Sequence, residues 1–255
     1  MAGTMNFGVL GALEVRLAEQ VFILRGPKLR KVLALLALRI NEVVCLDALI
    51  DELWAGEPPG SAVTTVRTHV YHLRKWLAAL PADDASRPYI DSRPNGYLLE
   101  APEQCVDADV FRLLHLRGRG QLRARQMEDA ADTFHQALAL WRGPVLADVQ
   151  QGPVLEPLAA ALSGLRDQVL ESRLEADIRR GRHREIVDEL RALVAAQPFN
   201  EWMHTQLINA LNQSGRRAEA LVAYRSLRTL LKRELGVEPS SEVQRLQDQI
   251  LKGVV

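Results

Sequence analysis

One spacing in the C-terminal half restricts the fold more than any other feature of the sequence. Residues 181–186 (GRHREI) and 215–220 (GRRAEA) match one another at a distance of 34 residues. Beyond these segments, Leu190 corresponds to Tyr224, and Leu193 corresponds to Leu227. A repeat of this length is one helix–turn–helix unit, which buries its apolar face only by stacking on a neighbouring unit. The sequence therefore predicts a stack of helical repeats in this half.

A less regular unit precedes these two copies. Its small and large apolar residues recur at helical spacing: Leu114, Gly118, Ala130, Phe134 and Ala137. An insertion rich in Gly and Pro, residues 141–153, puts this unit out of phase with the later copies. The period is that of tetratricopeptide repeats. Residues 105–255 are therefore predicted to form an all-α, tetratricopeptide-like domain.

The first 104 residues contain strand signals at both ends. Residues 5–25 alternate loosely between apolar and polar types and break at Gly8 and Gly11, which predicts two or three short strands. Near the other end, Asn95-Gly96 separates two short apolar runs. This dipeptide is a strong hairpin signal.

Helical signals fill the region between these strands. Apolar residues recur at helical spacing over residues 27–40, 47–54 and 62–79. Pro27 suits the first turn of the first helix, and Ser61 is a candidate N-cap of the third. Strands, three helices and a hairpin in this order predict a winged helix-turn-helix over residues 1–104. The whole chain is thus predicted to be mainly α with a small β part.

Charge is concentrated on two of the predicted helices. The formal net charge is zero, which argues against a strongly basic packaging protein. Residues 25–39 nevertheless contain five basic side chains and no acid, and residues 61–76 contain three, with two histidines and no acid. A DNA-binding surface needs basic residues gathered in this way. Two solvated helix faces would carry the same charges, so charge alone leaves both interpretations open.

Other classes of function are not indicated. Cys45 and Cys105 are the only cysteines, too few for a four-cysteine zinc site, and no histidine of the helical half has a partner at ligand spacing. No nucleophile–base constellation stands out. We therefore expect no enzyme activity, no metal and no cofactor. No membrane span or signal peptide is evident either, so we expect a cytoplasmic, nucleoid-associated protein.

Four segments resemble the Streptomyces antibiotic regulatory protein family. They are residues 25–36 (RGPKLRKVLALL), residues 53–75 with Leu53-Trp54, Pro58-Pro59 and VRTHVYHLRK, residues 95–99 (NGYLL) and residues 234–240 (ELGVEPS). They occur in the family's order and span essentially the whole chain. The chain is identified as a member with an OmpR-type winged helix followed by a bacterial transcriptional activation domain. It contains no Gly-x-x-x-x-Gly-Lys-Ser/Thr loop, so we expect a short form without the ATPase module of larger members.

The resemblance implies a function. It implies a sequence-specific transcriptional activator of a secondary-metabolite (antibiotic) gene cluster. Such a protein binds tandem direct repeats in double-stranded promoter DNA, pairs on them, and recruits the RNA polymerase holoenzyme through sigma and other subunits. The alternative is a ligand- or peptide-sensing DNA-binding regulator whose helical repeats serve sensing or dimerisation.

The third helix is the candidate reader, because a helix distinguishes all base pairs only in the major groove. Resemblance to OmpR-type readers places Thr68 and His72 at base contacts and Arg67, Tyr71 and Arg74 nearer the backbone. The wing tip is a candidate for the minor groove, and the start of the first helix for a phosphate. The predicted DNA-contacting residues are Lys28, Arg30, Thr64, Arg67, Thr68, Tyr71, His72, Arg74, Lys75, Arg93 and Asn95. In the loop between the second and third helices, Glu57 is the candidate polymerase contact.

Overall fold

The computed structural model describes residues 5–81 and 87–253. Contacts divide these residues into two compact units. The first contains the described residues up to Ala124 together with Asp132–Ser172, and the second contains Arg125–Ala131 together with the residues from Arg173 onward. The start of the helical half therefore belongs to the same compact unit as the N-terminal residues.

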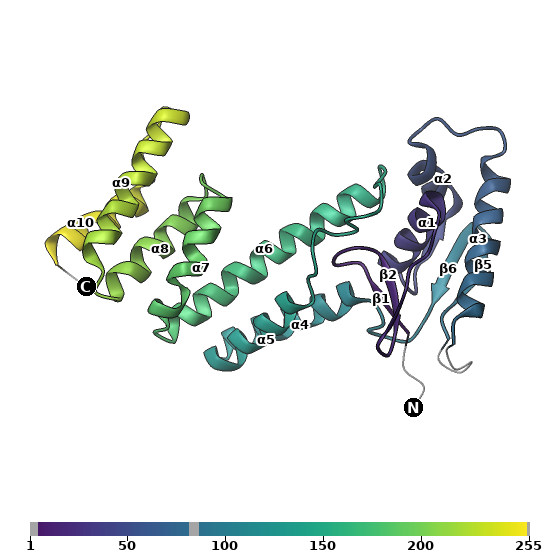
Figure 1. Cartoon of the computed structure of the whole chain (residues 1–255), viewed down its shortest axis with the longest axis horizontal. Coiled ribbons are helices and arrows are strands. Elements are labelled where there is room, and N and C mark those ends of the chain that lie inside the picture. The colour runs from purple at the N-terminus through teal and green to yellow at the C-terminus, as the bar shows by residue number, and fades with distance from the viewer. Residues whose placement is uncertain (1–4, 82–86, 254–255) are drawn as a thin grey trace. The chain divides into compact units, whose positions relative to one another are not determined.

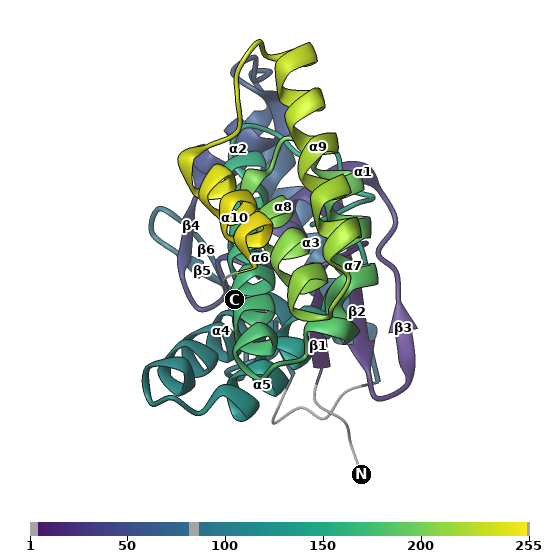
Figure 2. The same cartoon turned by 90° about the vertical axis from the view of Figure 1, so that its left-hand side faces the viewer.

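The first unit contains two small antiparallel sheets (Figures 1 and 2). The first sheet is a meander of β1 (Met5–Gly8), β2 (Glu14–Leu17) and β3 (Gln20–Phe22). The second contains β4 (Val43–Cys45), β6 (Gly96–Glu100) and β5 (Tyr89–Arg93) in that order. The predicted strands and hairpin are confirmed, and β4 is an additional strand that the sequence did not indicate.

Gly96 allows β4 to join the hairpin. A Cβ atom at this position would lie 2.0 Å from the carbonyl oxygen of Val44 and 2.8 Å from the Cα of Cys45. No side chain fits at this distance, so the glycine of the hairpin turn is also the residue that lets a third strand pair with β6.

Three helices complete the winged helix: α1 (Pro27–Leu38), α2 (Leu46–Trp54) and α3 (Ala62–Ala79). Every residue from Val32 to Leu38 is buried, so α1 is surrounded rather than half-exposed. In α3 the buried residues recur every three or four positions, as predicted, and the opposite face is exposed. Ser61 occupies the N-cap position of α3, but its side chain makes no capping hydrogen bond. Its carbonyl instead accepts from the Thr65 amide at 2.9 Å.

The remaining elements are helices, as the repeats predicted. They are α4 (Asp107–Arg123), α5 (Met127–Ala139), α6 (Leu155–Arg179), α7 (His183–Ala196), α8 (Glu201–Gln213), α9 (Arg217–Glu234) and α10 (Ser241–Lys252). In the early unit, Gly118 of α4 lies against the ring of Phe134, where a Cβ would be 2.5 Å from the ring. In the second compact unit, α8 packs against both α7 and α9 (Figures 1 and 2).

The 34-residue spacing corresponds to two equivalent turns. Gly181 and Gly215 have φ angles of 75° and 78°, a left-handed conformation that glycine adopts without strain. After each glycine the next amide reaches back across the helix end: Arg182 N donates to Asp177 O at 3.1 Å, and Arg216 N donates to Leu211 O at 2.9 Å. This is the Schellman type of helix end. The predicted helix–turn–helix repeat is thus confirmed at both copies.

Within residues 5–81 and 87–253, none of the helices combines the length and the apolar character needed to span a bilayer.

Candidate nucleic-acid interface

The exposed face of α3 carries the side chains that the sequence singled out. Its exposed residues include Thr64, Arg67, Thr68, Tyr71, His72 and Lys75. Their opposite neighbours Val66, Val70 and Leu73 are at most 1% exposed and anchor the helix in the core. The packing of one face therefore fixes which side chains the other face presents.

Several side chains on this face restrain one another. The Lys75 ammonium lies 4.9 Å from the centre of the Tyr71 ring, and the Tyr71 and His72 rings lie edge to face with centroids 5.6 Å apart. The Thr68 hydroxyl donates to the Thr64 carbonyl at 3.0 Å, which leaves the oxygen lone pairs and the methyl group exposed. Side chains held in this way lose less conformational freedom when they bind a surface.

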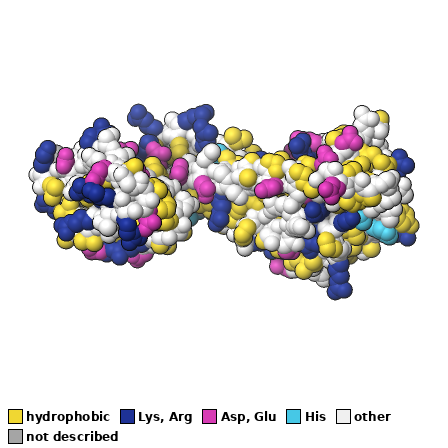
Figure 3. Space-filling view, turned by 90° about the horizontal axis from the view of Figure 1, so that it is seen from above, with side chains coloured by type: hydrophobic (Ala, Val, Ile, Leu, Met, Phe, Trp, Pro, Cys, Tyr) yellow, Lys and Arg dark blue, Asp and Glu magenta, His cyan; other side chains and the backbone are white. Residues whose placement is uncertain are grey.

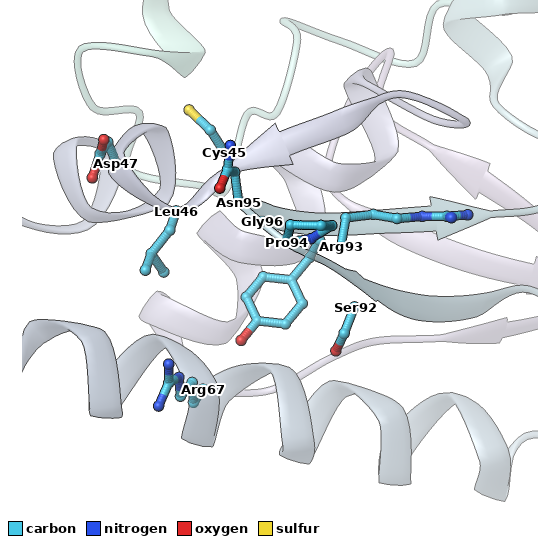
Figure 4. A pocket seen from close by; sticks show the side chains of 10 residues that line it. Cys45, Leu46, Asp47, Arg67, Ser92, Arg93, Pro94, Asn95 and Gly96 are labelled. Atoms are coloured by element: carbon cyan, nitrogen blue, oxygen red, sulfur yellow. The ribbon is translucent and has the colours of Figure 1, made fainter.

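A hollow of about 550 Å³ lies between α3 and the wing. Arg67 contributes from α3, Arg93 from the end of β5, and Pro94 and Asn95 from the turn between β5 and β6 (Figure 4). The hollow also contains the acidic Asp47, so positive charge does not line it throughout. The wing turn at Asn95 is held to the start of α2, because the Leu46 amide donates to the Asn95 carbonyl at 2.9 Å.

Arg93 at the wing has acidic neighbours that sequence reasoning did not pair with it. Its guanidinium lies 3.2 Å from an Asp91 oxygen and 4.0 Å from a Glu100 oxygen. Figure 4 shows the side chain running along its strand, not toward Arg67. The side chain remains 44% exposed, so a phosphate has access to it but must compete with two carboxylates.

Arg74 connects α3 to the wing. Its Nε donates to the Ile90 carbonyl at 2.8 Å, and its Nη2 donates to the Ser92 hydroxyl at 2.9 Å. An arginine has five N–H donors, so these two bonds leave others for a phosphate. In the structure Arg74 thus holds α3 to the wing. The sequence predicted only a contact with the DNA backbone.

Lys28 of α1 lies against Trp54 at the end of α2. Its ammonium is 4.6 Å from the centre of the Trp54 ring, a cation–π contact. Burial lowers the pKa of the half-buried His69 on α3, and the positive charges of Lys28 and His72 lower it further. His69 therefore favours its neutral form in the fold, and the side chain of Lys28 is exposed at the surface.

Arg30 is engaged inside the protein, unlike Lys28. Its guanidinium donates to the carbonyls of Leu24 and Leu13 and lies 2.5 Å from an Asp148 oxygen, and its side chain is 11% exposed. The sequence grouped Arg30 with Lys28 as a phosphate contact because both lie in the first turn of α1. The Arg30 guanidinium instead pairs with the carboxylate of Asp148, which is distant along the chain. We therefore omit Arg30 from the interface.

Glu57 lies in an exposed loop between α2 and α3. Ala55 and Gly56 have positive φ angles of 49° and 93°, which turn the chain sharply after α2. The Glu57 amide donates back to Trp54 O at 3.1 Å. In the part of the chain that the structure describes, its carboxylate makes no hydrogen bond or ion pair, so the charge faces solvent.

Sequence reasoning missed a set of ionic contacts that joins the first sheet to the start of α4. Asp107 accepts from the amides of Val9 and Leu10, and Arg142 binds both Asp107, at 2.8 Å, and Glu14. Burial raises the pKa of the Asp107 carboxyl, although these hydrogen bonds and the Arg142 charge oppose the shift. In the sequence, these contacts were indicated only by an acidic residue in the first turn of α4, and such residues are common in helices.

The described residues also bear on the metal and cysteine expectations. Among them, no three His, Cys, Asp or Glu side chains gather as metal ligands would. Cys45 is exposed and Cys105 is buried, and both thiols are free. Burial raises the pKa of the Cys105 thiol to about 11, so it stays protonated and unreactive near neutral pH. On the face seen in Figure 3, basic and acidic side chains are interspersed within each unit.

Two family models match the chain. Residues 20–99 match the model described as "Transcriptional regulatory protein, C terminal", and residues 106–251 match "Bacterial transcriptional activator domain". The first match covers α1–α3 and the wing, and the second covers α4–α10. The order of the two matches is the order in which the candidate DNA surface and the helical repeats occur.

Two regulatory proteins of Streptomyces species are similar over most of this chain. It is 40% identical over 237 residues to the regulatory protein DnrI of Streptomyces peucetius, which covers 90% of this chain and 85% of DnrI. It is 37% identical over 254 residues to the regulatory protein AfsR of Streptomyces coelicolor, covering 98% of this chain and 24% of AfsR. The match thus covers 85% of DnrI but about a quarter of AfsR.

A solved structure has the same fold. It is that of Mycobacterium tuberculosis EmbR in complex with a low affinity phosphopeptide, with a TM-score of 0.88 and 34% sequence identity. The match covers 98% of this chain and 66% of that one. By sequence, the chain spans 63% of EmbR, so EmbR contains further regions with no counterpart in the match.

Proposed function

Because the chain belongs to the Streptomyces antibiotic regulatory protein family of DNA-binding transcriptional activators, we propose that it activates a secondary-metabolite gene cluster. It binds tandem direct repeats in double-stranded promoter DNA and recruits RNA polymerase. The observation that carries the proposal is the exposed, basic and hydroxyl-bearing face of α3, held beside the wing by Arg74. We retain residues 1–104 as the DNA-binding module and 105–255 as the activator module.

In this proposal α3 lies in the major groove. Thr68 and His72 read base edges, where a hydroxyl, an imidazole nitrogen and a methyl group each match groups that bases display. The flanking residues contact the sugar–phosphate backbone and fix the register: Thr64, Arg67, Tyr71, Arg74 and Lys75. Lys28 adds a phosphate contact at the start of α1, and the wing contributes Arg93 and Asn95 at the adjacent minor groove.

Two molecules occupy the two repeats in the same orientation. A helix-turn-helix contacts one face of the duplex, so two molecules side by side on one face need half-sites about 10–11 base pairs apart. The order of the half-sites comes from the family, and the geometry of a single reading helix supports it. The protein acts where the promoter is, on the nucleoid.

Recruitment uses two surfaces in this proposal. The loop Gly56–Gly60 offers Glu57 to sigma or another polymerase subunit, and its two prolines lower the cost of ordering it. The helical repeats offer a larger second surface. A carboxylate that faces solvent with no described partner supports the first contact, since no internal bond must break when polymerase binds.

One observation favours the alternative, a regulator that senses a ligand or peptide. In the second compact unit, a hollow of about 390 Å³ is lined mainly by apolar side chains of α7, α8 and α9, among them Leu207, Leu211 and Val222. Ligand sites are typically apolar hollows of this order of size. A sensing function predicts that DNA affinity or activation changes when such a ligand is added, whereas simple recruitment does not.

The test is footprinting and run-off transcription on promoters of the neighbouring gene cluster. We expect protection of two half-sites on one face of the duplex and transcription that depends on the protein. Inserting about five base pairs between the half-sites turns one of them to the opposite face. Cooperative binding that survives the insertion contradicts the tandem arrangement, and full occupancy without transcription contradicts recruitment.

A further inference from the structure

Glu52 of α2 is a buried carboxylate that the proposed DNA and polymerase contacts do not use. It is 1% exposed and accepts hydrogen bonds from three backbone amides: Gly152 N at 2.6 Å, Val154 N at 3.0 Å and Leu155 N at 2.8 Å. These amides lead into and begin α6, where unpaired N–H groups and the helix dipole favour a negative charge. One side chain of the winged helix thus caps a helix of the activator half.

The opposing chain is shaped to allow this contact. At Gly152, a Cβ would lie 2.5 Å from the Glu52 carbonyl oxygen and 2.8 Å from its Oε1. The backbone of Gly152 does not adopt a positive φ angle. Glycine is needed here because a side chain would collide with Glu52, not because of the backbone conformation. Lys31 of α1 completes the joint, because its Nζ donates to the Glu52 carbonyl at 3.2 Å and lies 3.9 Å from the carboxylate.

A second set of bonds fixes the segment that leads to α6. The Arg142, Leu146 and Ala147 amides donate to the carbonyls of Leu10, Val9 and Gly11 at 2.8, 3.0 and 3.1 Å, in the turn between β1 and β2. This set involves the N-terminal sheet, whereas Glu52 belongs to α2. The segment is thus held at the sheet independently of Glu52, and the Glu52 carboxylate links the start of α6 to α2 by hydrogen bonds.

We propose that Glu52 is a positioning residue for activation. The helix α2 ends at Trp54, and the loop Gly56–Gly60 follows directly. Glu52 ties the C-terminal turn of α2 to α6, so the position of the loop depends on the activator half. The inference rests on the proposed polymerase role of that loop. It assigns to Glu52 no contact with DNA or polymerase, and predicts that loosening the joint reduces activation more than DNA affinity.

The experiment compares full-length variants at matched promoter occupancy. Glu52→Ala removes the carboxylate, and Gly152→Ala blocks the contact without changing a charge. Glu52→Gln keeps the size and one acceptor oxygen, so we expect it to fold while the joint is weakened. Gly164→Ala, a position with nothing within 4 Å of the added Cβ, is the matched control for Gly152→Ala. The two readouts are hydrogen exchange of the amides of Gly152, Val154 and Leu155, and run-off transcription.

We expect exchange of these three amides to rise about tenfold or more in Glu52→Ala and Gly152→Ala, since bonds to a charged acceptor are lost. Transcription at matched occupancy should fall by about fivefold or more, a loss of about 1 kcal/mol, with a smaller loss in Glu52→Gln and none in Gly164→Ala. DNA affinity should stay within about twofold, since Glu52 lies outside the proposed DNA contacts.

Faster exchange with undiminished transcription would overturn the inference and leave a purely structural joint. Unchanged exchange in both alanine variants would overturn it as well, because the contact would then hold nothing in place. A wild-type protein that occupies the promoter without activating transcription would instead refute the proposed function, and this inference with it. The first two results leave wild-type activation intact, so the two failures are distinguishable.

Discussion

Arg74 on α3 and Ser92 on β5 are joined by a hydrogen bond of 2.9 Å from the guanidinium Nη2 to the hydroxyl. The same arginine donates to the Ile90 carbonyl, so its position is defined by the wing as much as by its own helix. Arg74 can therefore affect DNA affinity in two ways, through its charge and through its bonds to the wing.

Two substitutions separate these contributions. Arg74→Ala should weaken binding to all sequences and lower the slope of log affinity against log salt by about one, because one phosphate contact is lost. Ser92→Ala removes one of the two bonds from Arg74 to the wing, leaves the bond to the Ile90 carbonyl, and should reduce affinity slightly with an unchanged salt slope. Fluorescence anisotropy at several salt concentrations measures both. An unchanged slope in Arg74→Ala would show that the residue braces the wing and does not contact phosphate.

Specificity should depend on Thr68 and His72. We predict that Thr68→Ala and His72→Ala each change base preference, at a cost of about 1–3 kcal/mol per lost contact at the matched site. Binding to unrelated DNA should change little, because phosphate contacts remain. Affinities for a panel of single-base operator variants provide the measurement.

Thr65→Ala is the matched control for Thr68→Ala. Both hydroxyls donate to the carbonyl four residues earlier, at 3.0 Å in each case, but Thr65 is half-buried whereas Thr68 is exposed. The control should therefore retain the wild-type base preference. If Thr65→Ala alters the preference as much as Thr68→Ala, the reading face of α3 has been placed wrongly.

The fold was largely predictable where local signals are strong. The apolar spacing of Val66, Val70, Leu73 and Leu77 gave the buried face of α3, and the matched segments at Gly181 and Gly215 gave the repeat. The strand β4 was missed because three residues carry no usable periodicity. Its pairing depends on a glycine more than fifty residues away in sequence.

The candidate site was predictable in outline but not in its internal contacts. Exposure of Thr68 or Tyr71 follows from helix geometry alone. The sequence could not show that Arg30 pairs with Asp148 or that Glu52 caps α6, because each partner is distant along the chain. A charged residue on a short helix is usually solvated, so the pattern gave no sign that Glu52 is buried.

Acid should destabilise α8 and its neighbours through His204. Burial lowers the pKa of His204 below its ordinary value of 6.5, while the Pro198 carbonyl and the charge of Glu201 oppose the shift less strongly. As pH falls below about 6.5 the unfolded chain takes up a proton that the folded chain resists, so stability is lost in that direction. The stabilisation is fully present above pH 6.5.

His204→Gln tests this origin of the pH dependence. In the fold the His204 Nε2 lies 3.0 Å from the Pro198 carbonyl and donates to it, a bond that a glutamine amide retains without titrating. We expect the wild-type melting temperature to fall more between pH 7.5 and pH 5.5 than that of the variant. Equal decreases in the two proteins would show that other groups cause the acid sensitivity.

Activation should depend on the charge of Glu57. Glu57→Lys reverses a solvent-facing charge in the loop between α2 and α3, and we expect transcription at matched occupancy to fall several-fold because a complementary polymerase surface is repelled. The proposed DNA contacts of α3 are untouched, so site preference should not change. The added positive charge raises affinity for all DNA, and salt titration measures that contribution.

Glu103→Lys, at another exposed position of the winged-helix half, is the control for charge reversal alone. The informative comparison uses one template for both footprinting and run-off transcription with all three proteins. Equal transcription by Glu57→Lys and wild type at equal occupancy would remove the loop from the recruitment surface. The helical repeats would then be the remaining candidate for the polymerase contact.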